Sequence, residues 1–404
     1  MSNMLLISLL SFACLIVHLA IQRNPSHPGV VHGAIWLLIG LGYAGFQAEM
    51  EVVSSKTMGV LITGILVFSI GVHLGGKSIN LDYALPRAGR QFSYLPPAIV
   101  LISALGFVML CVKAFEYAPF NSDGSWRAWY VSLRGATVGH KGSFGSAGYV
   151  LNFCFAGVVY LILFSRRVRH TPWLWLCIVL SLGFALFSTG RTYLLLLVCM
   201  ILGAAMPKSW QTRVSILLLA PMLIVAVTWM SGRFDVTSGS GFAQHAKAYS
   251  IAAVSSLDYL VNSNLPQTWG SMTFRTPLAV LEAVGVPLTV PDLIQPNPLT
   301  RISSTNVYTV FSPYYRDFGL VGVAFFMLLL GALHGWVFRQ LKTGMPIIIV
   351  ANALLFYALL MQFFQDQYFS LMSQWIQILF WTYLLNKLQP LPVVSEWPRK
   401  SGSV

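Results

Sequence analysis

Residues 4–21 read MLLISLLSFACLIVHLAI and contain no charged side chain. A helix that crosses a bilayer needs about 20 consecutive, mostly apolar residues. Similar apolar runs recur along the whole chain and are separated by polar connections. The first run has neither a basic start nor a small-residue cleavage site, so we interpret it as a spanning helix rather than a secretion signal. The pattern predicts an all-α, polytopic membrane protein.

The composition excludes most water-soluble classes. The chain has 404 residues, of which 56% are hydrophobic and only 9% are charged, and its mean hydropathy is +0.70. A soluble domain carries roughly 25% charged residues. The formal charge of +13 does not indicate a nucleic-acid binder, because Lys and Arg stand in short clusters between apolar runs rather than on one solvated face. Without a soluble domain or an internal repeat, we expect residues 1–404 to form a single membrane domain.

The apolar runs predict about eleven transmembrane helices, with a range of 10–12. They lie at residues 4–21, 30–47, 58–75, 96–113, 149–164, 172–187, 191–206, 213–231, 318–336, 346–362 and 369–386. Cytoplasmic connections are enriched in Lys and Arg. With the N-terminus outside, the inner connections and the C-terminal tail hold fourteen of these residues, and the short outer connections hold Lys56 and Arg191. The charge distribution therefore favours an external N-terminus and a cytoplasmic C-terminus.

Two long loops, at residues 114–148 and 232–317, fall on the outer side in this topology. Loops of this length inside a compact protein are usually functional or disordered, and these are rich in Trp, Tyr, Phe and Pro rather than in charge runs. The second loop predicts short helices from Phe242 to Asn262 and from Pro277 to Val284. We expect the polar chemistry to concentrate on this side of the membrane.

Several kinds of site are not indicated by the sequence. The five cysteines fall in or at the ends of predicted spans, so neither a disulfide framework nor a zinc site is predicted. The eight histidines show no metal-ligand spacing, and the nucleotide-binding and nucleophile-elbow motifs are lacking. We expect a protein that uses no metal and no cofactor.

Arg134 in the first loop is followed by His140, Lys141 and Gly145, among glycines 135, 139 and 142. Glycine lets the backbone approach a ligand and point its N–H groups at an anion, and guanidinium binds phosphate as a bidentate fork. This stretch is either a phosphate cradle or a flexible loop with one basic residue.

The remaining outer cations have structural alternatives. Arg191 opens an apolar run, where a snorkelling anchor is the alternative to a site. In the second loop, Arg275 and Arg316 stand beside aromatic or apolar residues near predicted helix ends, which makes them the better candidates. Asp317 is a candidate base, but it also fits an ion pair with Arg316 or a helix cap. For His245 the favoured alternative is a solvated helix residue.

Two motifs resemble the O-antigen polymerase (Wzy) family. The sequence TNVYT at 305–309 is followed by PYYRDFG at 313–319 and by Gly322, and Gly190-Arg191-Thr192 precedes a Leu-rich span. Arg134 and Gly145, eleven residues apart, resemble an outer-loop motif of that family. The second loop departs from it, since Arg275 reaches Gly285 one residue early. The resemblance covers most of the chain in layout and only short stretches in residues.

The resemblance implies a GT-C-like fold in the bacterial inner membrane, with an active site that faces the periplasm. It implies a glycosyltransferase that polymerises oligosaccharide repeat units carried on undecaprenyl pyrophosphate into O-antigen or a related surface polysaccharide in lipopolysaccharide biosynthesis. The expected partners are this lipid-linked oligosaccharide, membrane lipid and a polysaccharide chain-length regulator, with no nucleic acid.

Outer guanidinium groups suit this chemistry, because preorganised cations stabilise the charge that develops on a pyrophosphate leaving group without a metal. We expect catalytic roles for Arg134, Arg275, Arg316, Asp317 and His245. We expect substrate contacts from Arg191, His140, Lys141, Gly145, Asn306, Tyr308, Tyr315 and Tyr249. The general base stays open among Asp317, His140 and His245.

Two rival functions share parts of the pattern. An O-antigen ligase, which transfers the glycan to lipid A core, has the same layout and a similar Gly-Arg-Thr opening. A transporter of lipid-linked oligosaccharide is the rival that is not an enzyme. Transporters commonly show internal repeats and ionisable residues near the bilayer midplane. The sequence has no such repeat and its spans are almost free of charge, so the polymerase is favoured.

Overall fold

The computed structural model describes residues 3–22, 24–46, 48–76, 94–120, 125–139, 144–164, 172–205, 251–263, 265–291 and 307–388. Of these residues, 79% are helical, and none lies in a strand. Within the same ranges, six helices are long and apolar enough to cross a membrane. The all-α, multi-pass membrane class predicted from the sequence is confirmed.

The six long helices are α1 (Asn3–Gln22), α2 (Pro28–Gly45), α3 (Ser55–Gly75), α4 (Leu95–Tyr117), α6 (Ser146–Phe164) and α13 (Phe311–Gln340). Shorter ones are α7 (Pro172–Phe187), α8 (Arg191–Ala205), α14 (Pro346–Leu360) and α15 (Met372–Leu388). The remaining elements are α5 (Trp126–Gly139), α11 (Ala252–Asn262), α12 (Arg275–Ala283) and the 3-10 helix η2 (Leu341–Thr343).

Ten of the predicted spans correspond to the six long helices and to α7, α8, α14 and α15. Nine of them agree with the observed bounds to within a few residues, and α13 begins seven residues earlier than predicted. The predicted span 213–231 lies outside the described residues, so the count of eleven stays a prediction, as does the GT-C class. α11 and α12 overlap the two short helices that we predicted in the second long loop. The first long loop contains α5.

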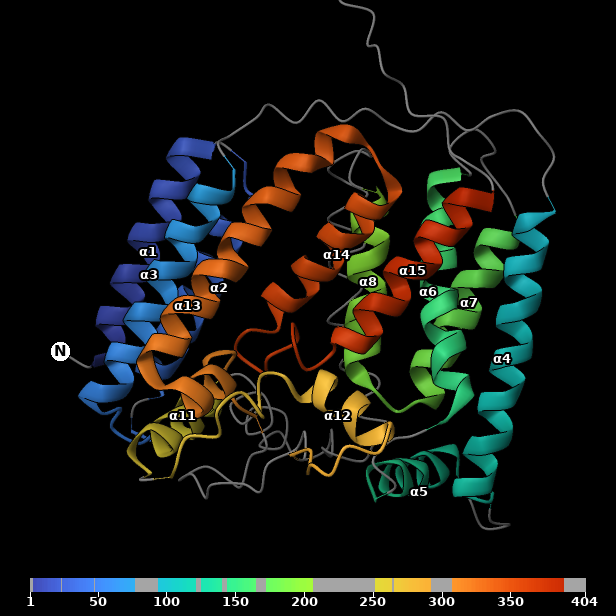
Figure 1. Cartoon of the computed structure of the whole chain (residues 1–404), viewed down its shortest axis with the longest axis horizontal. Coiled ribbons are helices and arrows are strands. Elements are labelled where there is room, and N and C mark those ends of the chain that lie inside the picture. The colour runs from blue at the N-terminus through green and yellow to red at the C-terminus, as the bar shows by residue number, and fades with distance from the viewer. Residues whose placement is uncertain are drawn as a thin grey trace, which may run out of the picture. The chain divides into compact units, whose positions relative to one another are not determined.

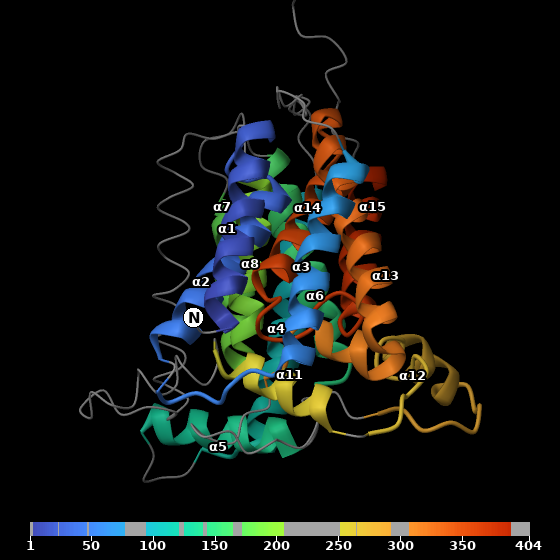
Figure 2. The same cartoon turned by 90° about the vertical axis from the view of Figure 1, so that its left-hand side faces the viewer.

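The chain forms two compact units. Unit 1 comprises residues 1–80, 239–339 and 355–373, and unit 2 comprises residues 81–238, 340–354 and 374–404. In unit 1, α1, α2, α3 and α13 lie side by side, and α11 crosses one end of this group (Figures 1 and 2). The predicted single domain for the whole chain stays a prediction.

Glycines allow α3 and α13 to cross at backbone contact. A Cβ added to Gly75 would lie 2.0 Å from the carbonyl oxygen of Ala332, and one added to Gly335 would lie 2.2 Å from that of Val72. Gly71 and Gly331 meet in the same way one turn along. Small residues four apart on each helix are the usual basis of close helix packing in membranes, where backbone approach replaces the hydrophobic effect.

Unit 2 is built on α4, α6 and α7, which pack against one another, and α8 packs on α6 and α7. Gly106 of α4 receives the side chain of Val150, and Gly157 of α6 receives Ile99. α5 runs roughly across the end of α4 rather than beside it (Figure 1). The amide of Asn152 donates to Gln377 at 2.8 Å, which links α6 to α15 inside the unit.

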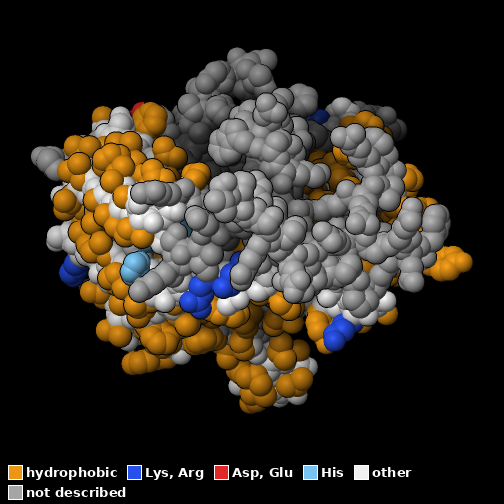
Figure 3. Space-filling view, turned by 90° about the horizontal axis from the view of Figure 1, so that it is seen from above, with side chains coloured by type: hydrophobic (Ala, Val, Ile, Leu, Met, Phe, Trp, Pro, Cys, Tyr) orange, Lys and Arg blue, Asp and Glu red, His pale blue; other side chains and the backbone are white. Residues whose placement is uncertain are grey.

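Hydrophobic side chains make up most of the described surface seen in Figure 3, and Lys and Arg are few and scattered there. Exposed apolar residues such as Leu38, Leu101 and Phe325 are more than half accessible. A water-soluble protein rarely carries continuous apolar surface of this extent. Lipid chains would cover it at no cost in a membrane.

Candidate active site

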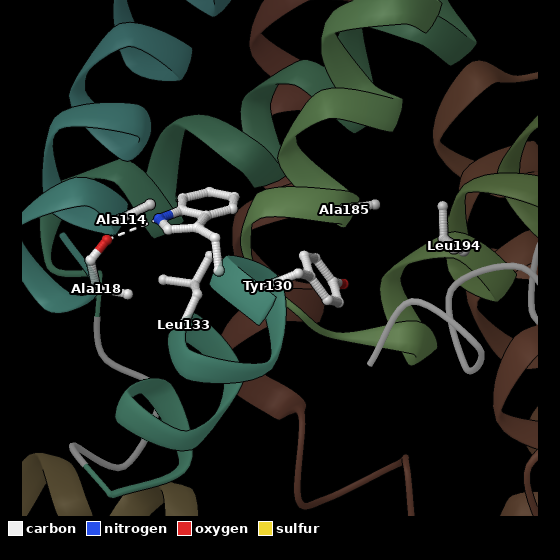
Figure 4. Packing of buried hydrophobic residues seen from close by; sticks show 7 residues of the cluster. Ala114, Ala118, Tyr130, Leu133, Ala185 and Leu194 are labelled. Atoms are coloured by element: carbon white, nitrogen blue, oxygen red, sulfur yellow. Dashed lines mark hydrogen bonds between the residues drawn. The ribbon is translucent and has the colours of Figure 1, made fainter. Parts of the chain in front are cut away.

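The apolar face of α5 docks on unit 2 and fixes the position of Arg134. Trp129, Tyr130 and Leu133 of α5 are buried against Ala114 and Ala118 at the end of α4, and against Ala185 and Leu194 (Figure 4). The indole N–H of Trp129 donates to the carbonyl of Ala118 at 2.7 Å. α5 is therefore held by packing and by a buried hydrogen bond, although it is not itself a spanning helix.

Arg134 contacts the turn that opens α8. Its Nη1 donates to the carbonyl oxygen of Thr189 at 2.8 Å, and the hydroxyls of Thr137 and Thr189 lie 2.9 Å apart. Thr189 is buried and has a φ of 55°, a costly conformation for a β-branched residue. Gly190 and Arg191 follow directly in sequence, so Arg134 contacts the turn that precedes Arg191. The side chain of Arg191 is outside the described part of the chain.

Gly145 lies at the start of α6 and has a φ of 56°. A Cβ added there would meet nothing within 4 Å. It forms part of the wall of a half-open groove of about 420 Å³ between the end of α4 and the start of α6. Ligand pockets commonly measure about 300–1,000 Å³. The predicted substrate residue Gly145 is thus at an accessible cavity.

In unit 1, Asp317 ties the start of α13 to residues 268–273. One carboxylate oxygen accepts from the hydroxyl of Thr268 and from the backbone N–H of Met272, and the other accepts from the N–H of Thr273 at 2.6 Å. The carboxylate is fully buried. We expected an ion pair with Arg316 or a helix cap, and among the described residues Asp317 makes neither. Its bonds to three neutral donors favour a structural role.

The same corner carries Arg275 and Arg316. The backbone carbonyl of Arg316 accepts from the N–H of Thr268, and Arg275 begins α12 two residues after Thr273. Arg275 donates its Nε to the carbonyl of Pro291 at 2.8 Å. Both residues are half-buried, and neither forms an ion pair with a described residue. Two cations are therefore linked to the same segment, residues 268–275, and neither is paired with a described carboxylate.

The other predicted site residues divide between the described and undescribed parts of the chain. Tyr308 is half-buried, and its N–H donates to the carbonyl of Phe364 at 3.1 Å. Burial, and then the nearby Tyr259, raises the pKa of Tyr308. Tyr315 is half-buried beside Arg316. Five predicted residues lie outside the described residues, namely His140, Lys141, His245, Tyr249 and Asn306.

Sequence reasoning missed a buried polar network between α14 and α15. Gln362 bonds both to Nδ1 of His32 on α2, at 2.7 Å, and to the hydroxyl of Tyr368. That hydroxyl lies 2.9 Å from His334 of α13. Gln362, Asp366, Gln367 and Tyr368 of this loop are buried, so their polar groups need partners from within the protein. A signal was present in the polar residues Gln362, Gln365, Asp366 and Gln367, which stand between two predicted spans.

Asp366 anchors this loop. Its carboxylate accepts from the hydroxyl of Tyr314 at 2.9 Å and from the backbone N–H groups of Tyr368, Phe369 and Ser370. Burial raises the pKa of Asp366, and these donors oppose that effect. The carbonyl of Phe369 in turn accepts from the hydroxyl of Thr276 on α12. The network therefore supports the helix that begins with Arg275.

No group of three His, Cys, Asp or Glu side chains in the described ranges is arranged to hold a metal ion. The two arginine-bearing corners are instead suited to anions, because each presents guanidinium at or beside the start of a helix, where the helix dipole also favours negative charge.

No known family profile matches the chain, and no solved structure matches it. An O-antigen polymerase of Shigella dysenteriae is 23% identical over 374 residues, which cover 89% of this chain and 91% of that protein. The chain is similar to an O-antigen polymerase. Since the similar region takes in most of both units, it is a likeness of the whole multi-pass protein rather than of one loop.

Proposed function

We propose that this protein is a metal-independent glycosyltransferase that polymerises oligosaccharide repeat units carried on undecaprenyl pyrophosphate. The growing glycan passes from its lipid carrier to a newly delivered unit at the periplasmic face of the inner membrane. The product is O-antigen or a related surface polysaccharide, and a chain-length regulator is a partner. The motif resemblance and the similarity to the Shigella protein support this assignment.

The observation that carries the proposal is the pair of guanidinium groups at Arg275 and Arg316. Neither forms an ion pair with a described residue, although both residues are half-buried. Keeping a partly buried cation without a counter-ion costs free energy. A substrate with two phosphate groups supplies the missing negative charge, and Arg binds phosphate oxygens as a bidentate fork.

The topology supports a common side for the proposed site residues. If the predicted spans, 213–231 included, alternate in direction, an external N-terminus places the two long predicted loops on the outer side. Arg134, Arg275 and Arg316 belong to these loops, and Arg191 belongs to a short outer connection. Their charge runs against the inward preference of Lys and Arg, which is expected of residues retained for binding rather than for topology.

The reaction exchanges one bond at the anomeric carbon of the donor sugar. The bond from this carbon to the pyrophosphate oxygen breaks, and its electron pair leaves with undecaprenyl pyrophosphate. A hydroxyl oxygen of the acceptor sugar forms the new glycosidic bond, and its proton passes to a base or to water. Arginines at Arg134, Arg275 and Arg316 stabilise the charge on the leaving group, each hydrogen bond contributing about 1.5–3 kcal/mol.

A transporter of lipid-linked oligosaccharide is the second candidate, and one observation favours it. The sequence argument against it was the scarcity of ionisable residues in the spans, but His32, His334 and Asp366 are buried inside unit 1. Polar side chains and broken helices inside a membrane bundle are typical of transport pathways. The network here is largely satisfied by its own hydrogen bonds, which fits a structural anchor better than a pathway.

The test is the lipopolysaccharide banding pattern of a deletion strain complemented with wild type, Arg134→Ala, Arg275→Ala or the control Arg339→Ala. Arg339 lies in the last turn of α13, at the opposite end from Arg316. A polymerase gives a ladder with wild type and the control, and a single repeat unit with the other two. Long glycan left on the carrier identifies a ligase, and normal ladders in both outer variants refute the site assignment.

A further inference from the structure

α12 is a short helix with little packing to hold it in place. It has nine residues, Arg275–Ala283, and none of them is buried. Isolated helices shorter than about 12–15 residues are marginal in water. Its first turn also has no side-chain cap, because Phe274 stands at the capping position and forms no such hydrogen bond. The direction in which Arg275 points therefore depends on a few specific contacts.

Two side-chain hydrogen bonds link the first turn of α12 to other described segments. Nε of Arg275 donates to the carbonyl of Pro291 at 2.8 Å, and the hydroxyl of Thr276 donates to the carbonyl of Phe369 at 3.2 Å. Pro291 belongs to the same stretch of chain, residues 265–291, so the first bond holds the guanidinium to its own segment. The Thr276 bond joins residues that are 93 positions apart, and it is the one of the two that ties α12 to the rest of unit 1.

The acceptor of the Thr276 bond is itself held in place. The N–H of Phe369 donates to the buried carboxylate of Asp366 at 3.2 Å, and the N–H of Ser370 donates to it at 3.1 Å. The ring of Phe369 also packs against that of Phe274, just before α12. An apolar contact of this kind is non-directional, whereas a hydrogen bond requires one geometry. The Thr276 hydroxyl therefore fixes the start of α12 relative to the buried loop.

Arg275 keeps its Nη groups available, since among the described residues its hydrogen bond is made by Nε and it forms no ion pair. We propose that Thr276 is a positioning residue, whose hydrogen bond to Phe369 fixes the rotation of α12 and so directs these Nη groups toward the phosphates of the substrate. Arg binds phosphate as a planar fork, for which orientation matters. The inference rests on the proposed function and adds to it a residue that acts through Arg275 without touching the substrate.

Steady-state polymerisation of purified lipid-linked repeat units by the full-length protein in nanodiscs tests the proposal. Thr276→Val removes the hydroxyl and keeps the branched shape, whereas Thr276→Ser keeps the hydroxyl. Thr343→Val is the matched control, because Thr343 is also half-buried and its hydroxyl also donates to a backbone carbonyl, that of Gln340 at 2.8 Å, beyond the other end of α13. Thermal unfolding of each variant is measured alongside.

We expect Thr276→Val to lower kcat by about ten- to a hundredfold with little change in KM, because a misplaced group weakens contacts made in the transition state. Thr276→Ser and Thr343→Val should turn over as wild type does, and all three variants should keep the wild-type Tm. Wild-type kcat in Thr276→Val would overturn the proposal. A loss of kcat that Thr276→Ser shares, or that accompanies a lower Tm, would overturn it too.

A second comparison asks whether Thr276 acts through Arg275. Arg275→Lys keeps the charge and loses the fork, so adding Thr276→Val to that variant should lower kcat by less than about twofold. An equal loss in both backgrounds would show an independent role for Thr276 and overturn the proposal. Normal polymerisation by Thr276→Val refutes this inference alone, whereas no polymerisation by the wild-type protein refutes the proposed function and this inference with it.

Discussion

Replacing Asp317 by Asn separates a structural carboxylate from a catalytic base. One side-chain oxygen remains to accept from Thr268 and Met272, but an NH₂ group replaces the oxygen that accepts from the N–H of Thr273 at 2.6 Å. The change removes a hydrogen bond to a charged acceptor, worth about 1.5–3 kcal/mol, and leaves a buried donor facing another donor. We expect a loss of about 2–4 kcal/mol, because the corner relaxes in part.

The assay compares thermal unfolding of the full-length protein in detergent with its polymerisation rate on lipid-linked repeat units. At about 2–4 °C per kcal/mol for a unit of this size, Asp317→Asn should lower Tm by roughly 4–16 °C. Thr268→Val is the companion variant, since it removes one of the three donors and leaves the carboxylate intact. A structural role predicts that both variants lose stability and activity together. The reasoning is refuted if Asp317→Asn keeps the wild-type Tm and loses activity more than about a hundredfold while Thr268→Val stays active, because that is the behaviour of a general base.

Three further predictions concern stability. Gly75→Ala should sharply reduce the yield of folded protein, since its Cβ would lie 2.0 Å from the carbonyl oxygen of Ala332. The control Gly59→Ala should instead stabilise α3 by about 0.5–1 kcal/mol, because its Cβ meets nothing within 4 Å. Equal yields of the two folded variants would refute the packing argument. Trp129→Ala should cost about 3–5 kcal/mol and release α5, measured by Tm and by faster proteolysis within residues 126–139, which Trp129→Phe should largely prevent. Burial, and then the positive charges of His18 and His73, lowers the pKa of His27 to about 4, so the folded protein favours the neutral ring. The contribution of His27 to the free energy of unfolding should therefore be complete above pH 6.5 and decline by about 3 kcal/mol as the pH falls toward 4. Unfolding of His27→Gln, measured over the same pH series, should lack this decline.

The sequence predicted the spans well because the bilayer leaves little choice of structure. A polar backbone inside hydrocarbon must form its hydrogen bonds within the segment, so an apolar run long enough to cross becomes a helix. The end of α14 differs by two residues from the predicted bound. We extended one span to residue 362, but α14 ends at Leu360, because Gln362 turns inward to bond with His32 and Trp36.

The candidate site was harder to predict, because its contacts join residues that are distant in sequence. Arg134 and Thr189 are 55 residues apart, and Asp317 is 44 residues from Thr273. Adjacency suggested that Asp317 pairs with Arg316, and nothing in the local pattern revealed that residues 268–273 fold over its carboxylate. The arginines were easier to find, since outer-side cations contradict the topology rule that explains the other Lys and Arg residues.

The way the carboxylates are used explains why the arginines remain available. Asp258 accepts from the backbone N–H of Ser54, Asp317 accepts from a hydroxyl and two N–H groups, and Asp366 accepts from Tyr314 and three N–H groups. Each of these carboxylates is satisfied by neutral donors, so none neutralises a guanidinium. The chain has 25 Lys and Arg and only 12 Asp and Glu, and within the described ranges Arg275 and Arg316 form no ion pair. Under the proposed function, a pyrophosphate-bearing substrate would give Arg275 and Arg316 the anionic partner that the described carboxylates do not supply, whereas a neutral glycan would not.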